Sequence, residues 1–394
     1  MSRRGAYPVL KDLTFPAIYM GLLAAFVGFS SSFAIVLAGL SAMGATEGQV
    51  ATGLFFATLG MGIGSIWLAA ATRIPAAVAW STPGAAFLAS TQALPGGFPE
   101  AVGALIVCAG LIVLTGLIPA LGRAVAAIPK PIANALLAGV LLPLCLAPAQ
   151  AAGLAPWAIL PLVGAWIVGL ALHRLAAMPA TILALIAVIA FGSDNGAAVQ
   201  MGGLPDLTPI APVFSLQAVI SIGIPLYLVT MAGQNIPGFA VLDLHGYTYD
   251  RPPLLRRTGI VSAAFAPFGS IPVNMSAITA AMMSGEDAGP DPARRYWAAI
   301  TSGVAYVVLA VFAAPVVALA AVAPAGVITA VAGLALIPAL VGALSGAFGE
   351  GKRIEGPALT LLISASGTTL LGISGAVWGV LAGLLVWGVT ARRR

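Results

Sequence analysis

Two adjacent side-chain amides, Gln234 and Asn235, lie deep in an apolar stretch that runs from residue 216 to residue 242, and they are flanked by Gly and Pro. A polar group without a partner costs several kcal/mol in a lipid environment, so both amides need hydrogen bonds. Neighbouring helices supply such bonds in many membrane proteins. The adjacent amides beside Gly and Pro favour contact with a polar ligand instead.

Two Pro-marked segments provide a second kind of chemistry. One contains Ser81-Thr82-Pro83-Gly84 and the other contains Pro272-Val273-Asn274-Met275-Ser276. Each predicts a short extended run followed by a short helix. In the first segment the helix start is marked by Ser or Thr before Pro, which is a typical helix start. A helix that begins inside the membrane leaves up to four N–H groups unpaired and carries about half a positive charge at that end. Two such ends would attract an anion, whereas the alternative is that these prolines only start or kink ordinary packed helices.

Aromatic residues near these segments could form the wall of a pocket for a planar ligand. Phe29 and Phe33 share one face of the first apolar segment with neighbouring serines, and Phe87 follows the Ser-Thr-Pro-Gly turn. Helix packing is the alternative interpretation of such a stripe. The predicted ligand-binding residues are Ser31, Phe33, Ser81, Thr82, Pro83, Gly84, Phe87, Gln234, Asn235, Asn274, Met275 and Ser276.

The composition shows which class of fold positions these residues. The chain has 394 residues, of which 7% are charged and 60% hydrophobic, and its mean hydropathy is +1.06. A soluble fold could not cover its surface with so few polar residues, so we predict an all-α polytopic membrane protein. The basic residues behind the net charge of +5 are spread through short loops. They therefore indicate membrane topology and not nucleic-acid binding. Cys108 and Cys145 lie in apolar segments, so we expect neither a disulfide, a metal site nor a cofactor.

The apolar segments predict about fourteen membrane crossings, each needing roughly 20 residues. The third and tenth are the broken ones. The predicted spans are 14–40, 48–72, 76–93, 100–121, 130–147, 156–173 and 177–192, then 216–242, 256–268, 270–285, 295–318, 325–346, 356–371 and 375–391.

Basic residues predict the orientation. All 17 Lys and Arg fall in one alternating set of loops, whereas the opposite loops contain only Glu47, Glu100, Asp194 and Asp206. Cytoplasmic loops carry the basic excess, so both termini should be cytoplasmic. We therefore expect a multi-pass protein of a bacterial-type inner membrane, surrounded by lipid.

Two sets of seven crossings predict an inverted repeat. The first repeat covers 1–192, the connecting loop 193–215 and the second repeat 216–394. Paired short segments interrupted by Pro or Gly in two halves point to a binding site at the bilayer midplane.

The run from Thr230 to Leu242, together with Asp243-Leu244-His245-Gly246-Tyr247 and the two Pro-marked turns, resembles the BenE family of benzoate and proton symporters. That family is similar to nucleobase transporters with seven-plus-seven inverted repeats. The resemblance implies a substrate-carrying core domain (about 13–121 plus 216–318) and a gate domain (about 130–192 plus 325–391). It implies secondary active import of benzoate or a similar aromatic carboxylate with protons, by alternating access. A homodimer is a further option that the sequence leaves open.

This chain differs from nucleobase transporters in one respect. Those proteins carry acidic residues in the eighth and tenth segments, where this chain has Gln234, Asn235 and Asn274. Asp243 and His245 remain as proton-coupling candidates, although a solvated position near the loop is the alternative for both. The substrate could also carry its own proton, because a neutral acid crosses a medium of low polarity more cheaply.

Three rival functions remain. An intramembrane enzyme is disfavoured because the chain lacks HExxH, GxSxG and a close acidic pair within a span. An uncoupled anion channel is the second rival. A transporter of nucleobases or of an inorganic anion such as sulfate is the third.

Overall fold

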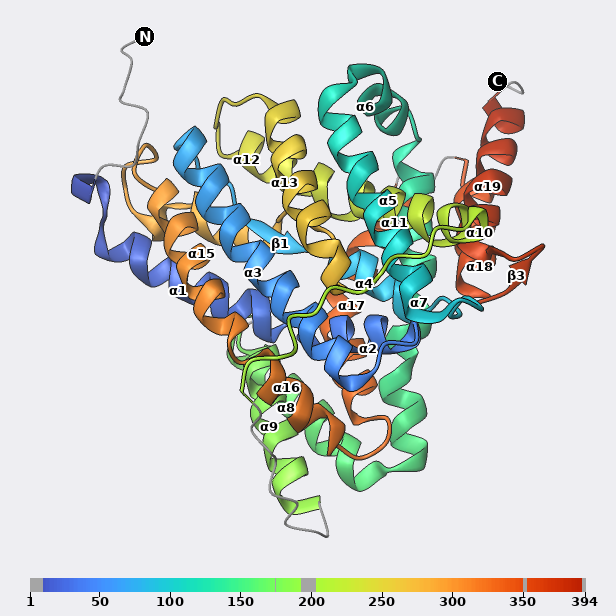
Figure 1. Cartoon of the computed structure of the whole chain (residues 1–394), viewed down its shortest axis with the longest axis horizontal. Coiled ribbons are helices and arrows are strands. Elements are labelled where there is room, and N and C mark those ends of the chain that lie inside the picture. Colours follow the sequence, from blue (N-terminus) through green and yellow to red (C-terminus); the bar gives the residue numbers. More distant parts are fainter. Residues whose placement is uncertain (1–9, 174, 193–202, 350–352, 392–394) are drawn as a thin grey trace.

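The computed structural model describes residues 10–173, 175–192, 203–349 and 353–391, and these form a helical protein (Figure 1). The first half contains α1 (Phe15–Ser30), α2 (Phe33–Ala42), α3 (Glu47–Thr72), α4 (Thr82–Ala89), α5 (Gly97–Leu117), α6 (Pro119–Ala126), α7 (Lys130–Leu154), α8 (Pro156–Leu172) and α9 (Ala177–Gly192). The second half contains α10 (Leu216–Ala218), α11 (Ile224–Thr230), α12 (Ile236–Leu244), α13 (Arg251–Phe265), α14 (Ile278–Ser284), α15 (Tyr296–Ala310), α16 (Ala313–Ala321), α17 (Val327–Phe348), α18 (Glu355–Ala365) and α19 (Gly375–Ala391).

Short elements complete the chain. They are the 3-10 turns η1 (Leu10–Asp12), η4 (Ala266–Phe268) and η5 (Glu286–Ala288), the π-helical turns η2 (Val219–Gly223) and η3 (Met231–Asn235), and the strands β1 (Val78–Trp80), β2 (Val273–Met275), β3 (Thr369–Leu370) and β4 (Ile373–Ser374).

Six helical stretches among the described residues are long and apolar enough to cross a membrane, or seven if α15 and α16 count as one bent span. Three shorter apolar helices, α8, α9 and α19, add to them. The polytopic helical class is confirmed, and the count of about fourteen stays a prediction. The predicted loop 193–215 lies partly outside the described residues, as do the two termini with their basic residues.

Some predicted spans differ in detail from the structure. The span 14–40 corresponds to one apolar stretch, Phe15–Ala42, whose helix is interrupted at Ser31 and Ser32. The hydroxyls of both serines donate to the Gly28 carbonyl oxygen and so compete with helical hydrogen bonding. The span 295–318 bends by 54° between α15 and α16. The span 130–147 continues to Leu154, and the span 356–371 ends at Ala365, before the β3–β4 hairpin. Gly367 and Gly372 of that hairpin region have positive φ, which glycine adopts without strain.

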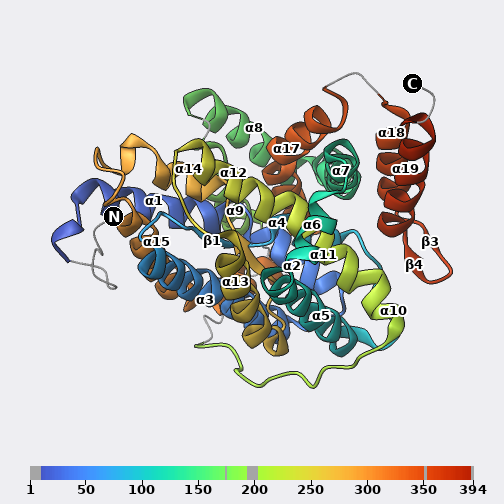
Figure 2. The ribbon, with the colours of Figure 1, turned by 90° about the horizontal axis from the view of Figure 1, so that it is seen from above.

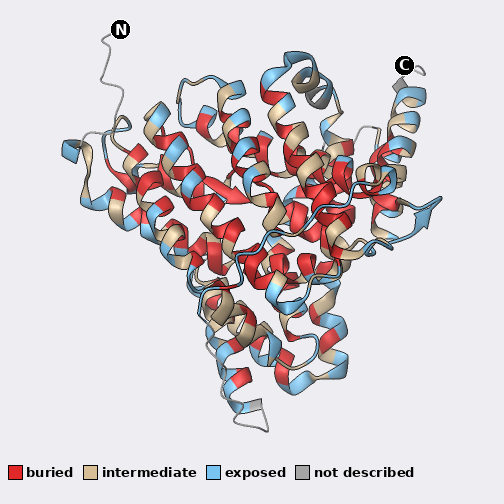
Figure 3. Cartoon of the chain, in the orientation of Figure 1, coloured by how far each residue is buried: buried red, intermediate tan, exposed pale blue. Residues whose placement is uncertain are grey.

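The predicted breaks in the third and tenth segments are confirmed, and the two breaks meet. Strand β1 precedes α4 and strand β2 precedes α14, and the strands pair antiparallel with Ala79 opposite Asn274. Both strands are fully buried, in the red centre of Figure 3. Irregular backbone at membrane depth is tolerated where protein surrounds it.

A serine from a neighbouring helix holds each strand. The Val78 N–H of β1 donates to Ser65 Oγ of α3 at 3.0 Å, and the Val273 N–H of β2 donates to Ser262 Oγ of α13 at 3.0 Å. Each hydroxyl also donates to the carbonyl oxygen of the same residue that it accepts from. The two broken segments therefore have matching supports.

The helices pack as two sets around the β1–β2 pair, which is the crossing of the two broken segments. Helix α3 packs on α15, α1 on α15, α13 on α5 and α2 on α4, whereas α7 packs on α17 and α18, and α18 on α19. Figure 2 shows α18 and α19 side by side at one edge, next to α7. Helix α4 contacts α7 and helix α2 contacts α17, so these contacts join the two sets.

Candidate substrate-binding site

The π-helical turn η3 places the two adjacent amides between the broken segments. Gln234 Nε2 donates to the Trp80 carbonyl oxygen of β1 at 2.9 Å. Asn235 Nδ2 donates to Asn274 Oδ1 of β2 at 2.9 Å, and Asn235 Oδ1 accepts from the Met275 N–H at 3.1 Å. Single π-turns inside α-helices are frequent at functional sites. Each amide therefore binds one of the two broken segments.

This network leaves one donor of Asn274 unused. The Met275 N–H fixes which end of the Asn235 amide is oxygen, and Asn235 Nδ2 then requires an oxygen from Asn274. Asn274 Nδ2 is fully buried and has no hydrogen-bond partner within the described part of the chain. An unpaired buried donor costs roughly 1–3 kcal/mol, so its retention points to a ligand or water at this position.

The start of α4 is closed by its own cap. Ser81 Oγ accepts from the Gly84 N–H at 3.0 Å and lies 2.8 Å from Thr230 Oγ1 of α11. Thr82 and Pro83 form the first helical turn, as the sequence predicts. The Gly84 and Met275 N–H groups belong to the two Pro-marked segments whose backbone the sequence predicts to attract an anion, and both are partnered inside the protein.

Aromatic rings border the crossing on the side of α1 and α2. Phe29 stacks on Phe33 with ring centroids 5.9 Å apart, and the Phe29 and Trp80 ring centroids are 5.6 Å apart. The Trp80 indole N–H donates to Ser32 Oγ at 2.8 Å. The break between α1 and α2 therefore orients an aromatic wall beside β1.

The structure brings Ser81, Gln234, Asn235, Asn274 and Met275 together, with Phe33 linked to them through Phe29 and Trp80. Ser276 follows β2, and its Oγ accepts from the Thr279 hydroxyl at 2.7 Å. Ser31 donates back to Gly28, and Phe87 lines a separate pocket near the far end of α4.

Asp243 and His245 lie outside the cluster, at the exposed end of α12. Asp243 Oδ2 accepts from Arg251 at 2.6 Å, and its Oδ1 accepts from the Tyr249 hydroxyl at 2.8 Å. Burial raises the pKa of Tyr249 and the neighbouring carboxylate raises it further, so this hydroxyl stays protonated and donates. His245 Nδ1 lies 2.9 Å from the Val241 carbonyl oxygen.

Sequence reasoning missed the residues that support the crossing. Ser65, Ser262 and Thr230 are single hydroxyls in apolar helices, where back-bonding to the helix is the ordinary expectation. Two glycines were also missed. A Cβ on Gly233 would lie 3.0 Å from Pro83 Cγ, and a Cβ on Gly238 would lie 2.8 Å from the Met275 backbone. These glycines let the eighth segment approach both broken segments.

Comparisons with known proteins agree with this architecture. The transmembrane domain of a cyanobacterial bicarbonate transporter, BicA, matches with a TM-score of 0.65 at 17% identity, covering 97% of this chain and 98% of that one. The structure of SLC26A9 matches with a TM-score of 0.62 at 14% identity, covering 97% of this chain and 66% of that one. At this identity the likeness shows the fold, which is that of membrane transporters.

The family follows from the sequence comparisons. The family model described as benzoate membrane transport protein, BenE, matches residues 11–389. The inner membrane protein YdcO of Escherichia coli is 35% identical over 379 residues, 93% of this chain and 94% of YdcO. The benzoate membrane transport protein of Acinetobacter baylyi is 28% identical over 388 residues, 96% of this chain and 95% of that protein. The chain is a membrane transporter, not an enzyme. It belongs to the BenE family.

Proposed function

We propose that the protein imports benzoate or a similar aromatic carboxylate across the inner membrane by alternating access, together with a proton. The family match and the name of the Acinetobacter relative support the substrate class. One structural observation carries the proposal: the unpaired Asn274 Nδ2 lies where two broken segments cross and where aromatic rings border the crossing.

In the proposed complex the carboxylate accepts a hydrogen bond from Asn274 Nδ2. The N-terminal end of α4, capped by Ser81, adds a favourable dipole for a negative charge. The ring of the substrate packs near Phe33, Phe29 and Trp80, because stacked and tilted aromatic pairs add about 0.5–1.5 kcal/mol beyond burial. Gln234 holds β1 in place through the Trp80 carbonyl oxygen.

The two packed sets of helices suit the core and gate domains that the family resemblance implies. Both broken segments and the eighth segment belong to the proposed core (about 13–121 plus 216–318), and α7, α17, α18 and α19 belong to the proposed gate (about 130–192 plus 325–391). A rigid movement of the core against the gate would carry the substrate between the two membrane faces, as inverted-repeat transporters do.

The proton travels with the substrate in this proposal. The amides at the crossing replace carboxylates, and Asp243 is paired with Arg251 at the exposed end of α12. Benzoate binds as the anion, and a proton then joins its carboxylate before the core moves. The species carried is neutral benzoic acid, which avoids the cost of moving a bare charge through a poorly polar path. A pH gradient would then drive accumulation without a protonatable side chain at the site.

Transport in proteoliposomes tests this proposal. An inside-alkaline pH gradient should drive accumulation of radiolabelled benzoate against its own gradient. Unlabelled benzoate should abolish the signal, while uracil, sulfate and benzamide should compete poorly, because each lacks either the aromatic ring or the carboxylate charge. Equal competition by benzamide, or strong inhibition by sulfate, would rule out an aromatic carboxylate site.

Uncoupled anion transport is the second candidate, because the structural neighbours include a bicarbonate transporter and SLC26A9. Uptake that follows the membrane potential and the benzoate gradient, without accumulation by a pH gradient, would favour it.

Gly84→Val should abolish benzoate uptake in the same assay. A Cβ at this position would lie 2.7 Å from Ser81 Oγ and 2.8 Å from Leu226 Cδ1, so the start of α4 must shift. Gly110→Val is the matched control, because a Cβ there meets nothing within 4 Å. Normal uptake by Gly84→Val would exclude the start of α4 from the substrate path.

Cysteine labelling tests the proposed orientation. Cys108 and Cys145 are replaced by Ser, and single cysteines are introduced at positions 206 and 352 of the otherwise cysteine-free chain. A membrane-impermeant reagent added from the periplasm should label position 206 and spare position 352. The reverse pattern would contradict cytoplasmic termini.

A further inference from the structure

The turn between β3 and β4 is docked on the eighth segment. Ser221 Oγ of η2 donates to the Gly372 carbonyl oxygen at 2.7 Å, and Gln217 Nε2 of α10 donates to the same oxygen at 3.4 Å. Ser221 is buried, whereas Gln217 is exposed. Strand β4 contacts η2, and Figure 2 shows the hairpin beside α10. The tip of the hairpin, Leu371-Gly372, therefore touches the apolar stretch that also carries the two adjacent amides.

The two partners in this contact belong to opposite domains of the proposed transporter. Ser221 lies in the proposed core, and the hairpin joins α18 to α19 of the proposed gate. The indole N–H of Trp378 on α19 donates to the Leu370 carbonyl oxygen at 3.1 Å, so the hairpin is fixed to the gate. Every hydrogen bond between core and gate among the described residues ends on the Gly372 carbonyl oxygen. The tip therefore makes a polar contact across the boundary of the two domains.

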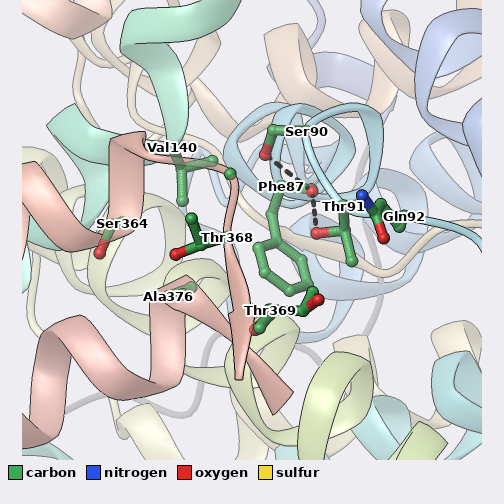
Figure 4. Close-up of a pocket in the computed structure, with 12 residues that line it drawn as sticks. Phe87, Ser90, Thr91, Gln92, Val140, Ser364, Thr368, Thr369 and Ala376 are labelled. Atoms are coloured by element: carbon green, nitrogen blue, oxygen red, sulfur yellow. Dashed lines mark hydrogen bonds between the residues drawn. The ribbon is translucent and has the colours of Figure 1, made fainter. Parts of the chain in front are cut away.

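The rest of this boundary is suited to sliding. Helix α4 packs on α7 and helix α2 packs on α17. Next to the hairpin, a surface hollow separates Phe87 and Thr91 at the end of α4 from Thr368 (Figure 4). Packed helices slide past one another in shear movements, whereas a directional hydrogen bond must break before its two partners separate. The contact on Gly372 is therefore the point that resists movement of the core against the gate.

The turn at the tip has an uncommon backbone conformation. Leu370 pairs with Ile373, and both residues between them have positive φ, 55° for Leu371 and 73° for Gly372. This two-residue turn suits the twist of a hairpin, but Asn, Asp or Gly usually occupies its first position because other side chains are strained there. Leu371 exposes 85% of its surface, so packing of its side chain does not hold the turn. Strained backbone persists where contacts fix it and is frequent at switch regions, and the hydrogen bonds on Gly372 are such contacts.

We propose that the β3–β4 tip is a latch that holds the gate on the core in this conformation and opens in each transport cycle. The latch rests on the proposed function, because a contact between core and gate has this role only in alternating access. It lies on the side that the basic residues predict to be periplasmic, since Arg353 precedes α18 and the chain then crosses once before the hairpin. Opening exchanges the hydrogen bonds on Gly372 for bonds to water, so the latch is reversible at a small net cost.

A reversible disulfide across the contact is the first test. Gln217→Cys/Leu371→Cys is made in the full-length chain with Cys108 and Cys145 replaced by Ser, and uptake of radiolabelled benzoate into proteoliposomes is measured before oxidation, after oxidation and after reduction. Oxidation should abolish uptake and reduction should restore it, because the tip can no longer leave η2. The oxidised protein in detergent should still bind benzoate, because the contact does not involve the residues of the crossing.

A disulfide within the hairpin is the matched control. Thr369 and Ser374 lie opposite each other on β3 and β4, so Thr369→Cys/Ser374→Cys joins two positions of the gate alone. Its oxidation should leave uptake unchanged. Loss of uptake with this pair as well would mean that any disulfide in the hairpin inhibits, and it would overturn the latch.

Ser221→Ala tests the hydrogen bond itself. Added to the Gln217→Cys/Leu371→Cys protein, it should slow disulfide formation by about two- to tenfold, the factor that corresponds to one hydrogen bond. The rate is measured as the loss of free thiols under a mild oxidant. Ser302→Ala is the control, because this buried hydroxyl donates only to the Ala299 carbonyl oxygen of its own helix, and it should leave the rate unchanged.

The remaining outcomes separate the latch from the proposed function. Normal uptake by the oxidised Gln217→Cys/Leu371→Cys protein would show that the tip and η2 move together, and it would overturn the latch while the proposed function stands. A pair that forms no disulfide, or a rate in Ser221→Ala equal to that in Ser302→Ala, would overturn the docked tip in the same way. An unmodified protein that accumulates no benzoate would overturn the proposed function and the latch with it.

Discussion

The two broken segments are similar in the serines that bind their strands but differ at the start of the helices that follow. Ser65 supports β1 and Ser262 supports β2 through the same pair of backbone groups. Beyond the strands, Ser81 caps α4 by accepting from the Gly84 N–H at 3.0 Å, and α4 has Pro in its first turn. Ser276 accepts from the Thr279 N–H of α14 at the longer distance of 3.4 Å, and α14 has no Pro in its first turn. The segment with β2 is anchored through Asn235, which binds both Asn274 and the Met275 N–H.

This difference indicates that the α4 side and the β2 side of the crossing have separate roles. The α4 side is closed by local hydrogen bonds, so its geometry is set before substrate arrives. The β2 side depends on Asn235 and keeps the unpaired Asn274 Nδ2. We therefore expect substrate to change the β2 side more than the α4 side.

Asn235→Leu should have the largest effect, because it removes the side chain that anchors β2. The substitution leaves the Met275 N–H and Asn274 Oδ1 without partners, which should cost about 2–5 kcal/mol of folding stability. The free energy of unfolding in detergent and benzoate uptake should both fall. Retained stability with normal uptake would show that Asn235 does not anchor β2.

Asn274→Ala sharpens the assignment of the ligand donor. Loss of Nδ2 should weaken benzoate binding by roughly 1–3 kcal/mol, the cost of an unpaired buried polar partner. Stability should change less, because this donor has no partner among the described residues without substrate. Unchanged affinity with a lowered melting temperature would assign Asn274 to packing alone.

Ser65→Ala and Ser262→Ala test the similarity of the two strands. Each substitution leaves a buried valine N–H unpaired, so each should lower stability by roughly 1–3 kcal/mol, and the two losses should be close to equal. Thermal melting of both single variants measures this. A loss confined to one variant would mean that the two supports are not equivalent.

Ser81→Ala and its counterpart Ser276→Ala should have the smallest effects. Ser81→Ala removes the cap of α4, worth roughly 0.5–2 kcal/mol, and the contact with Thr230. Ser276→Ala is the matched change after β2 and should cost less, because its bond to the Thr279 N–H is longer, at 3.4 Å. A larger loss from Ser276→Ala would reverse the roles assigned to the two helices.

The sequence alone determined the membrane class, the family resemblance and the two breaks at Ser81–Gly84 and Pro272–Ser276. These features are local, because apolar length, Pro and capping residues act within a few positions of the chain. The break at Ser31–Ser32 was also local, but serines inside apolar helices usually bond back to the helix without ending it.

The partners of these segments follow only from the tertiary structure. The pairing of Ala79 with Asn274, the separate partners of Gln234 and Asn235, and the pocket between α4 and α19 join residues that are far apart in the chain. Composition and spacing show that a buried amide needs a partner but not which one, because that choice depends on how the helices pack. The unpaired donor of Asn274 is therefore visible only once the helices are in place.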